Sequence, residues 1–422
     1  MKVLWLSKTP GLYPINRKIV GYNGGGWISS LQKLLLLDSD IDLGVVFISS
    51  ERLDSIQEQN VKYFPIKSHK MSPVKKLAKY YGLINTEGVS YNSDVLNIIN
   101  EFSPDLIHIF GLENEMIDVI NSTNIPIVVH LQGLLGPCAN AFWPVDYNSL
   151  SFIWPFSVQE WIIRNGFRYE KANLLRRAML EKQNFSKLSN VMGRTEWDKQ
   201  VTNLLSPLCN YYHVNEVLRE IFYQHSGEWS VKNGGKFIIT STISNTIYKG
   251  LDVIMKTAKL LKENTKIDIE WNVIGINQSA RIVKFFENKL GFTTSSIGIK
   301  ICGILSENLL CQKLLDSNLY VHPSYIDNSP NSVCEAQLLG LPVIACNVGG
   351  VSTLIEHGKT GYLVPANAPY ELAFYIKSLY SKPYLCSILG EGAYNVASMR
   401  HDKQIILHTL KETYISIINS QK

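Results

Sequence analysis

Two acidic residues, Asp327 and Glu335, stand in the stretch of this chain whose residue types best suit binding chemistry, and seven residues separate them. From Val321 to Gly350 we expect a buried strand, a polar loop, a short helix carrying Glu335, a Gly-Leu-Pro break, a second strand and a double glycine. A helix N-terminus supplies free N–H groups and a positive dipole end, which suits a phosphate. The pattern therefore indicates a nucleotide-sugar site, whose diphosphate cradle is predicted at the N–H groups of Asn331, Ser332 and Val333.

Each of these roles has a plainer alternative. Glu335 has apolar neighbours, and a buried carboxylate needs hydrogen-bond donors, which two ribose hydroxyls would supply. The alternative is a first-turn helix charge or a cap partner. Asp327 is expected to face the donor sugar or its leaving group, and its alternative is an Asx turn. The amides could also be satisfied by a local cap that uses Asn331 or Ser332.

A second candidate phosphate site lies upstream. Residues 236–261 predict a strand, a polar turn, Lys249-Gly250 and an amphipathic helix. A lysine that opens a helix opposes the helix dipole unless an anion lies there. Near the amino terminus, Gly24, Gly25 and Gly26 precede a helix that is expected from Trp27, and three glycines let the backbone approach a ligand. The alternative is a flexible surface turn, and the order G-x-G-x-x-G is absent.

Together these motifs resemble the donor-binding core of the retaining glycosyltransferases of family four (glycosyl transferases group 1, GT-B fold). That signature is Glu, seven residues and Glu-Ala, then Gly-x-Pro-Val and Gly-Gly. Its second half stands here as Glu335-Ala336, residues 340–343 and residues 349–350, whereas the first acid is Asp327, one methylene shorter. The resemblance places Lys249 on the diphosphate and the glycine loop over it. It also implies an Arg about five residues before Lys249, where this chain has Ser244, so one permanent charge is missing.

The fold class that we predict is α/β: a GT-B protein with two Rossmann-like, doubly wound parallel-sheet domains that face a cleft. Strands expected in the first half alternate with helices, as in such sheets; they are Val3–Leu6, Asp42–Ile48, Asp105–Phe110 and Ile125–His130, with helices at Val95–Phe102 and Glu113–Ile120. Further core strands are expected at Ile267–Ile274 and Leu319–Val321. The predicted domains are residues 1–205 on the acceptor side, a crossing segment at 206–235 and a donor-binding domain at 236–400. By resemblance, the last helix (401–420) returns to the first domain.

Ligands of parallel sheets gather at the carboxyl ends of the strands. His130 lies at such an end and is our candidate near the donor sugar and acceptor, although a lone histidine at a strand end is more often structural. Glu113 is a weaker candidate on the acceptor side. Gly303 ends a strand where the nucleotide base could stack or pair. No HExxH or Cys-x-x-Cys is present, so no metal and no other cofactor are expected.

Composition points to a cytosolic protein. The 422 residues suffice for two α/β domains, and 45% hydrophobic residues allow substantial cores. The seven cysteines show no paired spacing and no signal peptide is evident, so free thiols are expected. No apolar run reaches the roughly 18 residues that span a bilayer. A net charge of +5 without a recognisable module argues against nucleic-acid binding.

Basic residues cluster in two stretches. Residues 61–82 hold six lysines and no acid, and residues 154–188 hold seven Lys or Arg against three Glu, with aromatic residues interleaved in both. Such segments suggest docking on an anionic membrane surface, at the inner face of the membrane. The alternative is that they are solvated helix faces over a domain core.

By resemblance, the chain moves a hexosyl unit, with retention, from a nucleoside-diphosphate sugar to a glycan or lipid-linked acceptor. The expected setting is bacterial surface polysaccharide synthesis. Two alternatives stay open: a nucleotide-sugar epimerase of the same fold, and a catalytically silent nucleotide-sugar-binding subunit. The missing Arg and the shortened Asp327 motivate the second.

Overall fold

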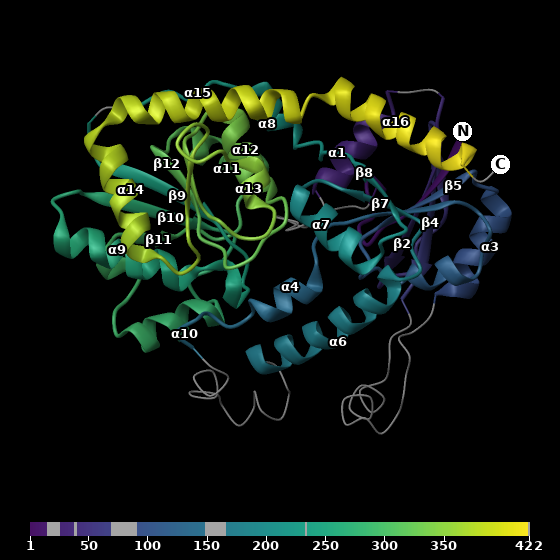
Figure 1. The fold of residues 1–422 in the computed structure, drawn as a ribbon, viewed down its shortest axis with the longest axis horizontal. Coiled ribbons are helices and arrows are strands. Elements are labelled where there is room, and N and C mark those ends of the chain that lie inside the picture. Colours follow the sequence, from purple (N-terminus) through teal and green to yellow (C-terminus); the bar gives the residue numbers. More distant parts are fainter. Residues whose placement is uncertain (15–25, 38–39, 69–90, 148–165, 233, 421–422) are drawn as a thin grey trace.

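A computed structural model describes residues 1–14, 26–37, 40–68, 91–147, 166–232 and 234–420 of the chain. Within them the chain forms two parallel-sheet domains side by side (Figure 1). The predicted architecture of two α/β domains built on parallel sheets is therefore confirmed. Gly24, Gly25 and much of both predicted basic stretches lie outside the described residues.

The first domain contains an eight-stranded sheet in the order β3-β4-β2-β1-β5-β6-β7-β8. Its strands pair in parallel except for the β3–β4 hairpin. In chain order they are β1 (Lys2–Leu6), β2 (Asp42–Ser49), β3 (Ile56–Glu58), β4 (Val61–Lys67), β5 (Leu106–Phe110), β6 (Ile127–His130), β7 (Asn190–Gly193) and β8 (Asn210–His213). The central strands are buried on both faces, which explains why they read as continuous apolar runs.

Helices cover both faces of the first sheet, and two apolar clusters lie under them. The described helices are α1 (Gly26–Leu35), α3 (Asn92–Phe102), the 3₁₀ turn η1 (Ile117–Asn121), α4 (Leu135–Asn140), α6 (Phe167–Phe185) and α7 (Glu196–Leu205). The helix that we predicted at Glu113–Ile120 is wrong, because only η1 forms there. The side chain of Asn114 bonds the carbonyl of Leu6 and the amide of Met116, which favours a turn over a longer helix.

The second domain contains a six-stranded sheet in the order β11-β10-β9-β12-β13-β14, with all pairs parallel. Its strands are β9 (Phe237–Thr242), β10 (Ile269–Ile274), β11 (Ile299–Ile301), β12 (Leu319–His322), β13 (Val343–Cys346) and β14 (Tyr362–Val364). The helices and 3₁₀ turns between or after them are η2 (Ile247–Lys249), α9 (Leu251–Asn264), α10 (Arg281–Leu290), η3 (Ser295–Ile297), α11 (Glu307–Leu315), α12 (Asn331–Leu339), α13 (Val351–Leu354), α14 (Pro369–Ser381) and α15 (Pro383–Arg400).

The segment that crosses between the domains differs from the predicted linker at 206–235. Strand β8 belongs to the first sheet, so that sheet extends to His213. A short helix, α8 (Glu220–Gln224), follows and contacts α11 and α12 of the second domain. An edge strand of four partly exposed residues has no apolar run to reveal it, which is why the sequence read as a linker.

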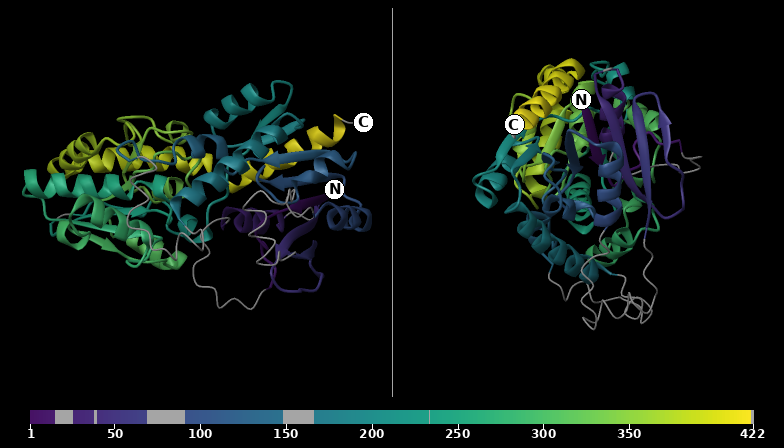
Figure 2. Two further views of the ribbon diagram at one scale, coloured as in Figure 1. Left: turned by 90° about the horizontal axis from the view of Figure 1, so that it is seen from below. Right: turned by 90° about the vertical axis from the view of Figure 1, so that its right-hand side faces the viewer.

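The chain returns to the first domain at its carboxyl end. Figure 1 shows α15 and α16 (Lys403–Asn419) running along one side of the molecule, with α15 over the second domain and α16 over the first. Both chain ends accordingly lie on the first domain in every view (Figure 2). The hydroxyl of Tyr414 on α16 accepts a hydrogen bond from Nε1 of Trp5 at 3.2 Å and lies 2.6 Å from Nδ1 of His108. This arrangement agrees with the return predicted from the resemblance.

We expect Tyr414→Phe to lower the free energy of unfolding by about 1–3 kcal/mol, because it leaves a buried indole N–H and imidazole nitrogen without their partner. Urea unfolding followed by tryptophan fluorescence measures the change. Tyr380→Phe is the matched control, since Tyr380 is 42% exposed. An equal, small effect of both substitutions would contradict the view that this contact fastens α16 to the first sheet.

Candidate functional site

Asp327 and Lys249 meet at the carboxyl edge of the second sheet. Lys249 ends the turn η2 after β9, and Asp327 lies in the loop after β12. The Nζ atom of Lys249 is 2.6 Å from Oδ2 of Asp327. Nε2 of His322, the last residue of β12, is 3.1 Å from the same oxygen. The structure thus joins two predicted site residues directly and adds His322, which the sequence analysis missed.

Glycines hold the loop of Asp327 against its neighbours on both sides. Gly250 follows Lys249 with φ +79°, and a Cβ atom there would lie 2.1 Å from the carbonyl oxygen of Pro323. On the other side, the amide of Gly350 donates to the carbonyl of Asp327 at 3.1 Å. A Cβ atom on Gly349 would come within 2.0 Å of that same oxygen. The Lys-Gly and Gly-Gly pairs are therefore needed for close backbone approach.

Asp327 is held in its ionised form. Burial favours the neutral acid, but the charge of Lys249 and the imidazole of His322 outweigh it and keep the pKa of Asp327 well below its usual range. A fixed negative charge and a fixed positive charge thus lie in contact at the sheet edge. The pair can stabilise charge separation. Asp327 itself, being ionised, cannot act as a general acid near neutral pH.

Helix α12 begins beside this pair, and only part of the predicted cradle is available. The amide of Val333 already donates to the carbonyl of Pro330 at 2.9 Å, so including it in the phosphate cradle was wrong. The amides of Asn331 and Ser332 donate to no group among the described residues. The physical reason is that α12 starts with a tight turn on Pro330, which uses the third amide internally.

Glu335 is buried on α12, as expected, yet its partner is an arginine. Nε and Nη2 of Arg219 donate to Oε1 and Oε2 of Glu335, both at 2.7 Å. Glu335 is 3% exposed and Arg219 27% exposed. Burial raises the pKa of Glu335 against the opposing charge of Arg219. Burial lowers the pKa of Arg219, but Glu335 more than offsets this and raises it overall. The only sequence signal for Arg219 was its place in the crossing segment.

The structure describes three other predicted donor-binding residues, Gly26, Gly303 and Ser244, and brings only Gly26 next to one of these pairs. Gly26 opens α1, and a Cβ atom there would lie 3.6 Å from Cδ of Arg219, so the end of the glycine loop lies next to the partner of Glu335. Gly303 follows β11 with φ +72°, and its carbonyl accepts from the amide of Gly275 at 2.8 Å. The hydroxyl of Ser244 lies 3.0 Å from that of Thr246.

His130 lies at the end of β6, as predicted, but its ring is fully buried. It packs against the rings of Trp27 and His108, whose centroids are 4.9 and 5.4 Å away. Burial holds its pKa well below the usual value. In this arrangement the ring has no exposed edge for a sugar, so the structural alternative describes His130 better than the predicted catalytic role. Glu113, the weaker acceptor candidate, lies 3.8 Å from Nζ of Lys8.

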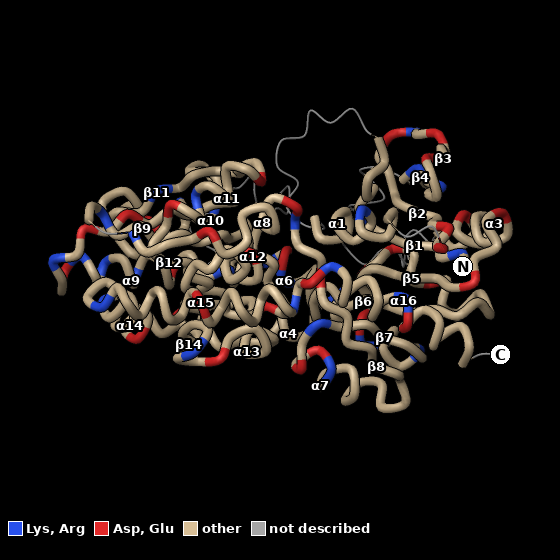
Figure 3. Tube along the Cα trace, turned by 90° about the horizontal axis from the view of Figure 1, so that it is seen from above, with Lys and Arg blue, Asp and Glu red and all other residues tan. Residues whose placement is uncertain are grey.

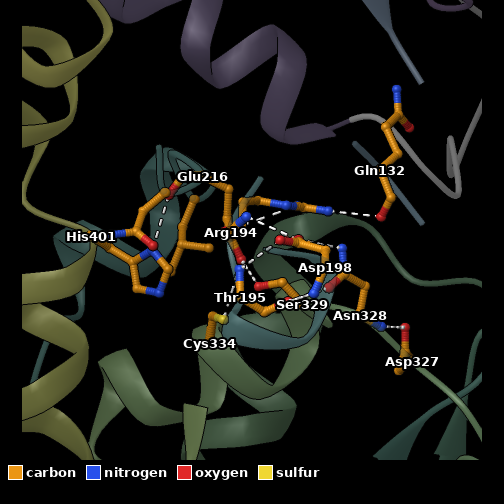
Figure 4. Close-up of polar contacts among 12 residues, drawn as sticks. Gln132, Arg194, Thr195, Asp198, Glu216, Asp327, Asn328, Ser329, Cys334 and His401 are labelled. Atoms are coloured by element: carbon orange, nitrogen blue, oxygen red, sulfur yellow. Dashed lines mark hydrogen bonds and ion pairs between the residues drawn. The ribbon is translucent and has the colours of Figure 1, made fainter. Parts of the chain in front are cut away.

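Polar contacts join the two domains directly beside Asp327 (Figure 4). The hydroxyl of Thr195, which caps α7, donates to Oδ1 of Asn328 at 2.7 Å. Nδ2 of Asn328 donates to Oδ2 of Asp198 at 3.0 Å. All three side chains are buried. The loop that carries Asp327 is therefore fixed by residues of the first domain.

Three side chains of metal-binding type also meet at this junction: Glu216, Cys334 and His401 lie within 4.8 Å of one another. Oε1 of Glu216 already accepts from Ser329 at 2.6 Å, and a guanidinium nitrogen of Arg194 is 3.9 Å from Oε2. Burial opposes ionisation of Glu216, but Arg194 and then His401 keep its pKa below the usual value. Because the guanidinium already supplies a positive charge, we assign this group to the domain junction rather than to a metal site.

Helix α4 of the first domain faces the Asp327 pair. Burial and then the nearby charge of Asp327 raise the pKa of the Cys138 thiol to about 12. At the start of α4, the amides of Leu135 and Gly136 donate to the carboxylate of Glu181 at 2.8–3.0 Å. Glu181 on α6 is 4% exposed, and burial raises its pKa to about 7 despite these bonds.

We expect a pH dependence of stability from Glu181. Its folded-state pKa exceeds the unfolded value of about 4.3, so its contribution is complete below that pH and is lost as pH rises to about 7. The melting temperature of Glu181→Gln should therefore approach that of the wild type between pH 5 and pH 8. Glu412→Gln, at an exposed position, should keep a constant difference. A constant difference for Glu181→Gln would contradict the prediction.

Residues 228–396, which contain the whole second sheet, match the family model described as glycosyl transferases group 1. The D-inositol 3-phosphate glycosyltransferase of Arthrobacter sp. (strain FB24) is 29% identical over 148 residues, which are 34% of each chain. The protein of that name in Rhodococcus jostii (strain RHA1) is 40% identical over 77 residues, 18% of this chain and 17% of its own. The matches thus span about a third of these relatives or less.

Solved structures are similar over nearly the whole chain. Sucrose-phosphate synthase of Thermosynechococcus elongatus superposes with a TM-score of 0.73 at 13% identity, over 99% of both chains. Anabaena HepE in complex with UDP gives a TM-score of 0.64 at 16% identity, over 99% of this chain and 100% of its own. TarM gives 0.62 at 13% identity, over 99% of this chain and 98% of its own. The chain thus has the GT-B fold, and most of its carboxy-terminal domain matches the glycosyl transferases group 1 model.

Proposed function

We propose that this protein is a retaining glycosyltransferase that moves a hexosyl unit from a nucleoside-diphosphate sugar to a hydroxyl of a glycan or lipid-linked acceptor. The observation that carries the proposal is the Lys249–Asp327 ion pair beside the start of α12, within the matched domain. Structural neighbours that were solved with UDP or UDP-glucose support a nucleotide-sugar donor. The setting that we propose is bacterial surface polysaccharide synthesis.

The pair suits the charge changes of glycosyl transfer. When the bond to the donor breaks, positive charge develops on the sugar and negative charge on the leaving diphosphate. Asp327 carries the charge that stabilises the first, and Lys249 the charge that stabilises the second. An ammonium has three donors, so Lys249 can bind a phosphate oxygen while one donor stays on Asp327. The free amides of Asn331 and Ser332 add donors at the helix N-terminus.

In this scheme the departing diphosphate takes the proton of the acceptor hydroxyl. The bond from the anomeric carbon to the phosphate oxygen breaks and the bond to the acceptor oxygen forms on the same face, so configuration is retained. The contribution of the protein is orientation and fixed charge. Lys249 and backbone amides provide the positive groups, and we propose that the reaction requires no metal or other cofactor.

Two other functions fit the same site. An epimerase would act on the donor without any acceptor. A silent nucleotide-sugar-binding subunit would bind the donor without turnover. Ser244 favours the silent subunit, because a hydroxyl bonded to Thr246 supplies no permanent charge where the resemblance implies an arginine. The bidentate Arg219–Glu335 pair favours an intact site, because it compensates the buried carboxylate that we expect to bind the ribose.

The test is a thermal-shift screen of UDP-, GDP- and ADP-sugars with and without EDTA, followed by assays of free nucleotide release. Stabilisation with release that rises when an acceptor is added would support a transferase, and the anomeric configuration of the product tests retention. Release of an isomerised sugar nucleotide without acceptor would support the epimerase. Stabilisation with neither outcome, across glycan and lipid-linked acceptors, would support the silent subunit. No stabilisation by any donor would refute the nucleotide site.

We expect Asp327→Asn and Lys249→Met each to lower the rate of nucleotide release by about a hundredfold or more, because each removes one charge of the pair. The measurement is a steady-state release assay with the donor found in the screen. Lys359→Met is the control, because Lys359 is 73% exposed and pairs with Glu356 on the surface. Wild-type rates in both site variants would contradict the assignment of Lys249 and Asp327 to the reaction.

We further propose that the protein acts in the cytoplasm at the inner face of the membrane, with α6 as its docking surface. Over the described residues, acids and bases are interspersed on both domains (Figure 3). On α6, however, both acids are engaged inward: Glu170 bonds Arg281, and Glu181 caps α4. None of the residues that α6 exposes is acidic; among them are Arg168, Leu175, Arg176, Met179, Leu180 and Lys182. No described helix is long and apolar enough to cross a bilayer.

Charge reversal on α6 should weaken membrane binding. We expect Arg176→Glu together with Lys182→Glu to reduce co-sedimentation with vesicles of phosphatidylcholine and phosphatidylglycerol by at least about tenfold, given about 1 kcal/mol per basic residue. The control is Lys284→Glu with Lys289→Glu, which reverses two exposed charges on α10. Equal binding of the two double variants, or binding unaffected by 0.5 M salt (roughly a 4 Å screening length), would contradict docking through α6.

A further inference from the structure

Arg219 is the residue whose place in the molecule the proposed chemistry does not yet explain. It precedes α8 in the segment that crosses between the domains. Its guanidinium meets the carboxylate of Glu335 side by side, with two parallel hydrogen bonds of 2.7 Å. A fork-to-fork pair of this kind fixes the plane of the carboxylate as well as its position.

Groups from both domains surround this pair. The side-chain stem of Arg219 lies against Gly26 at the start of α1 in the first domain. Its guanidinium stacks over the ring of Phe222, with 4.9 Å from Cζ to the ring centroid. The charges of Glu307 and of Glu335, on α11 and α12 of the second domain, both act on it. Arg219 therefore has little freedom to leave Glu335.

Glu335 needs such a partner to stay ionised. Burial favours its neutral form, and the nearby carboxylates of Glu307 and Glu216 favour it too. Arg219 provides the main opposing charge. A neutral carboxyl group carries a proton on one oxygen and accepts well through only the other, whereas a carboxylate accepts at both oxygens and has lone pairs left beside the two bonds to Arg219.

We propose that Arg219 is a positioning residue for the donor: it keeps Glu335 ionised and flat, so that both oxygens accept the two hydroxyls of a nucleotide ribose. The inference rests on the proposed function and specifies how the protein recognises the nucleotide part of the donor. It makes Arg219 a determinant of specificity for ribonucleotides over 2′-deoxyribonucleotides, because a deoxyribose leaves one oxygen of Glu335 with only its bond to Arg219.

The experiment measures binding of UDP, GDP and ADP and of their 2′-deoxy counterparts by calorimetry at pH 6, 7.5 and 9. The ribonucleotide that binds most tightly and its 2′-deoxy counterpart are then used for all variants. For the wild type we expect about a tenfold preference for ribose at each pH, the effect of about one charge-assisted hydrogen bond. Failure of all six nucleotides to bind would refute the proposed function and not this inference alone.

The Arg219→Met variant should show no preference for the ribonucleotide at pH 6 and part of the wild-type preference at pH 9. The sign follows from the acid: without the guanidinium the pKa of Glu335 rises further, so the carboxyl is neutral at low pH and ionises as pH rises. Arg219→Lys, which retains the charge, should keep more of the preference at pH 6. Glu335→Gln should lose it equally at all three pH values.

The matched control is Lys403→Met. Lys403 pairs with Glu220, the residue next to Arg219, at 2.6 Å, and its side chain is 30% exposed. It should leave the preference and its pH profile unchanged. A ribose preference that survives in Arg219→Met at pH 6 would overturn the inference. If that variant does not fold, a ribose preference retained in Glu335→Gln would overturn it equally.

Discussion

A carboxylate that is withdrawn from water must be compensated, and the functional face of this protein is arranged around that requirement. Asp327 is compensated by Lys249, 78 residues away in the chain, and Glu335 by Arg219, 116 residues away. Neither partner is local, so each pair forms only when the sheet edges and the crossing segment are in place. Folding of the second domain and packing of the crossing segment against it are therefore conditions for the charge pattern on which the proposed chemistry depends.

The same requirement couples the domains. The buried carboxylate of Glu216, in the crossing segment, accepts from Ser329 of the Asp327 loop and lies 3.9 Å from Arg194 of the first domain. Beside it, Asn328 is held by Asp198 and Thr195. Removing one member of such a network leaves a buried polar group unsatisfied, which costs more than the bond itself. The network therefore favours one arrangement of the domains over its alternatives.

The sequence predicted what local patterns determine. Continuous apolar runs gave the central strands, and the spacing of Asp327, Lys249 and the glycines located the contact that the structure makes. It did not predict Arg219 or His322, because nothing in a local pattern says which distant side chain will reach a buried acid. The sequence analysis also included the amide of Val333 among the free donors. The turn on Pro330 that occupies this amide depends on backbone geometry, which the residue types alone do not specify. The exposure of His130 depended on the position of Trp27, which packs over it from another element.

Arg219 lies in the crossing segment, and this position ties nucleotide recognition to the arrangement of the domains. The segment leaves the first sheet at β8 and enters the second domain at α8, so a rotation of one domain against the other moves it. A bidentate pair tolerates little displacement, because both 2.7 Å contacts lengthen together when the guanidinium tilts or shifts. A displacement that broke the pair would leave Glu335 buried without its compensating charge, and burial would then favour its neutral form. In the proposed scheme, competence to bind ribose therefore depends on the position of the crossing segment, which places Arg219 against Glu335.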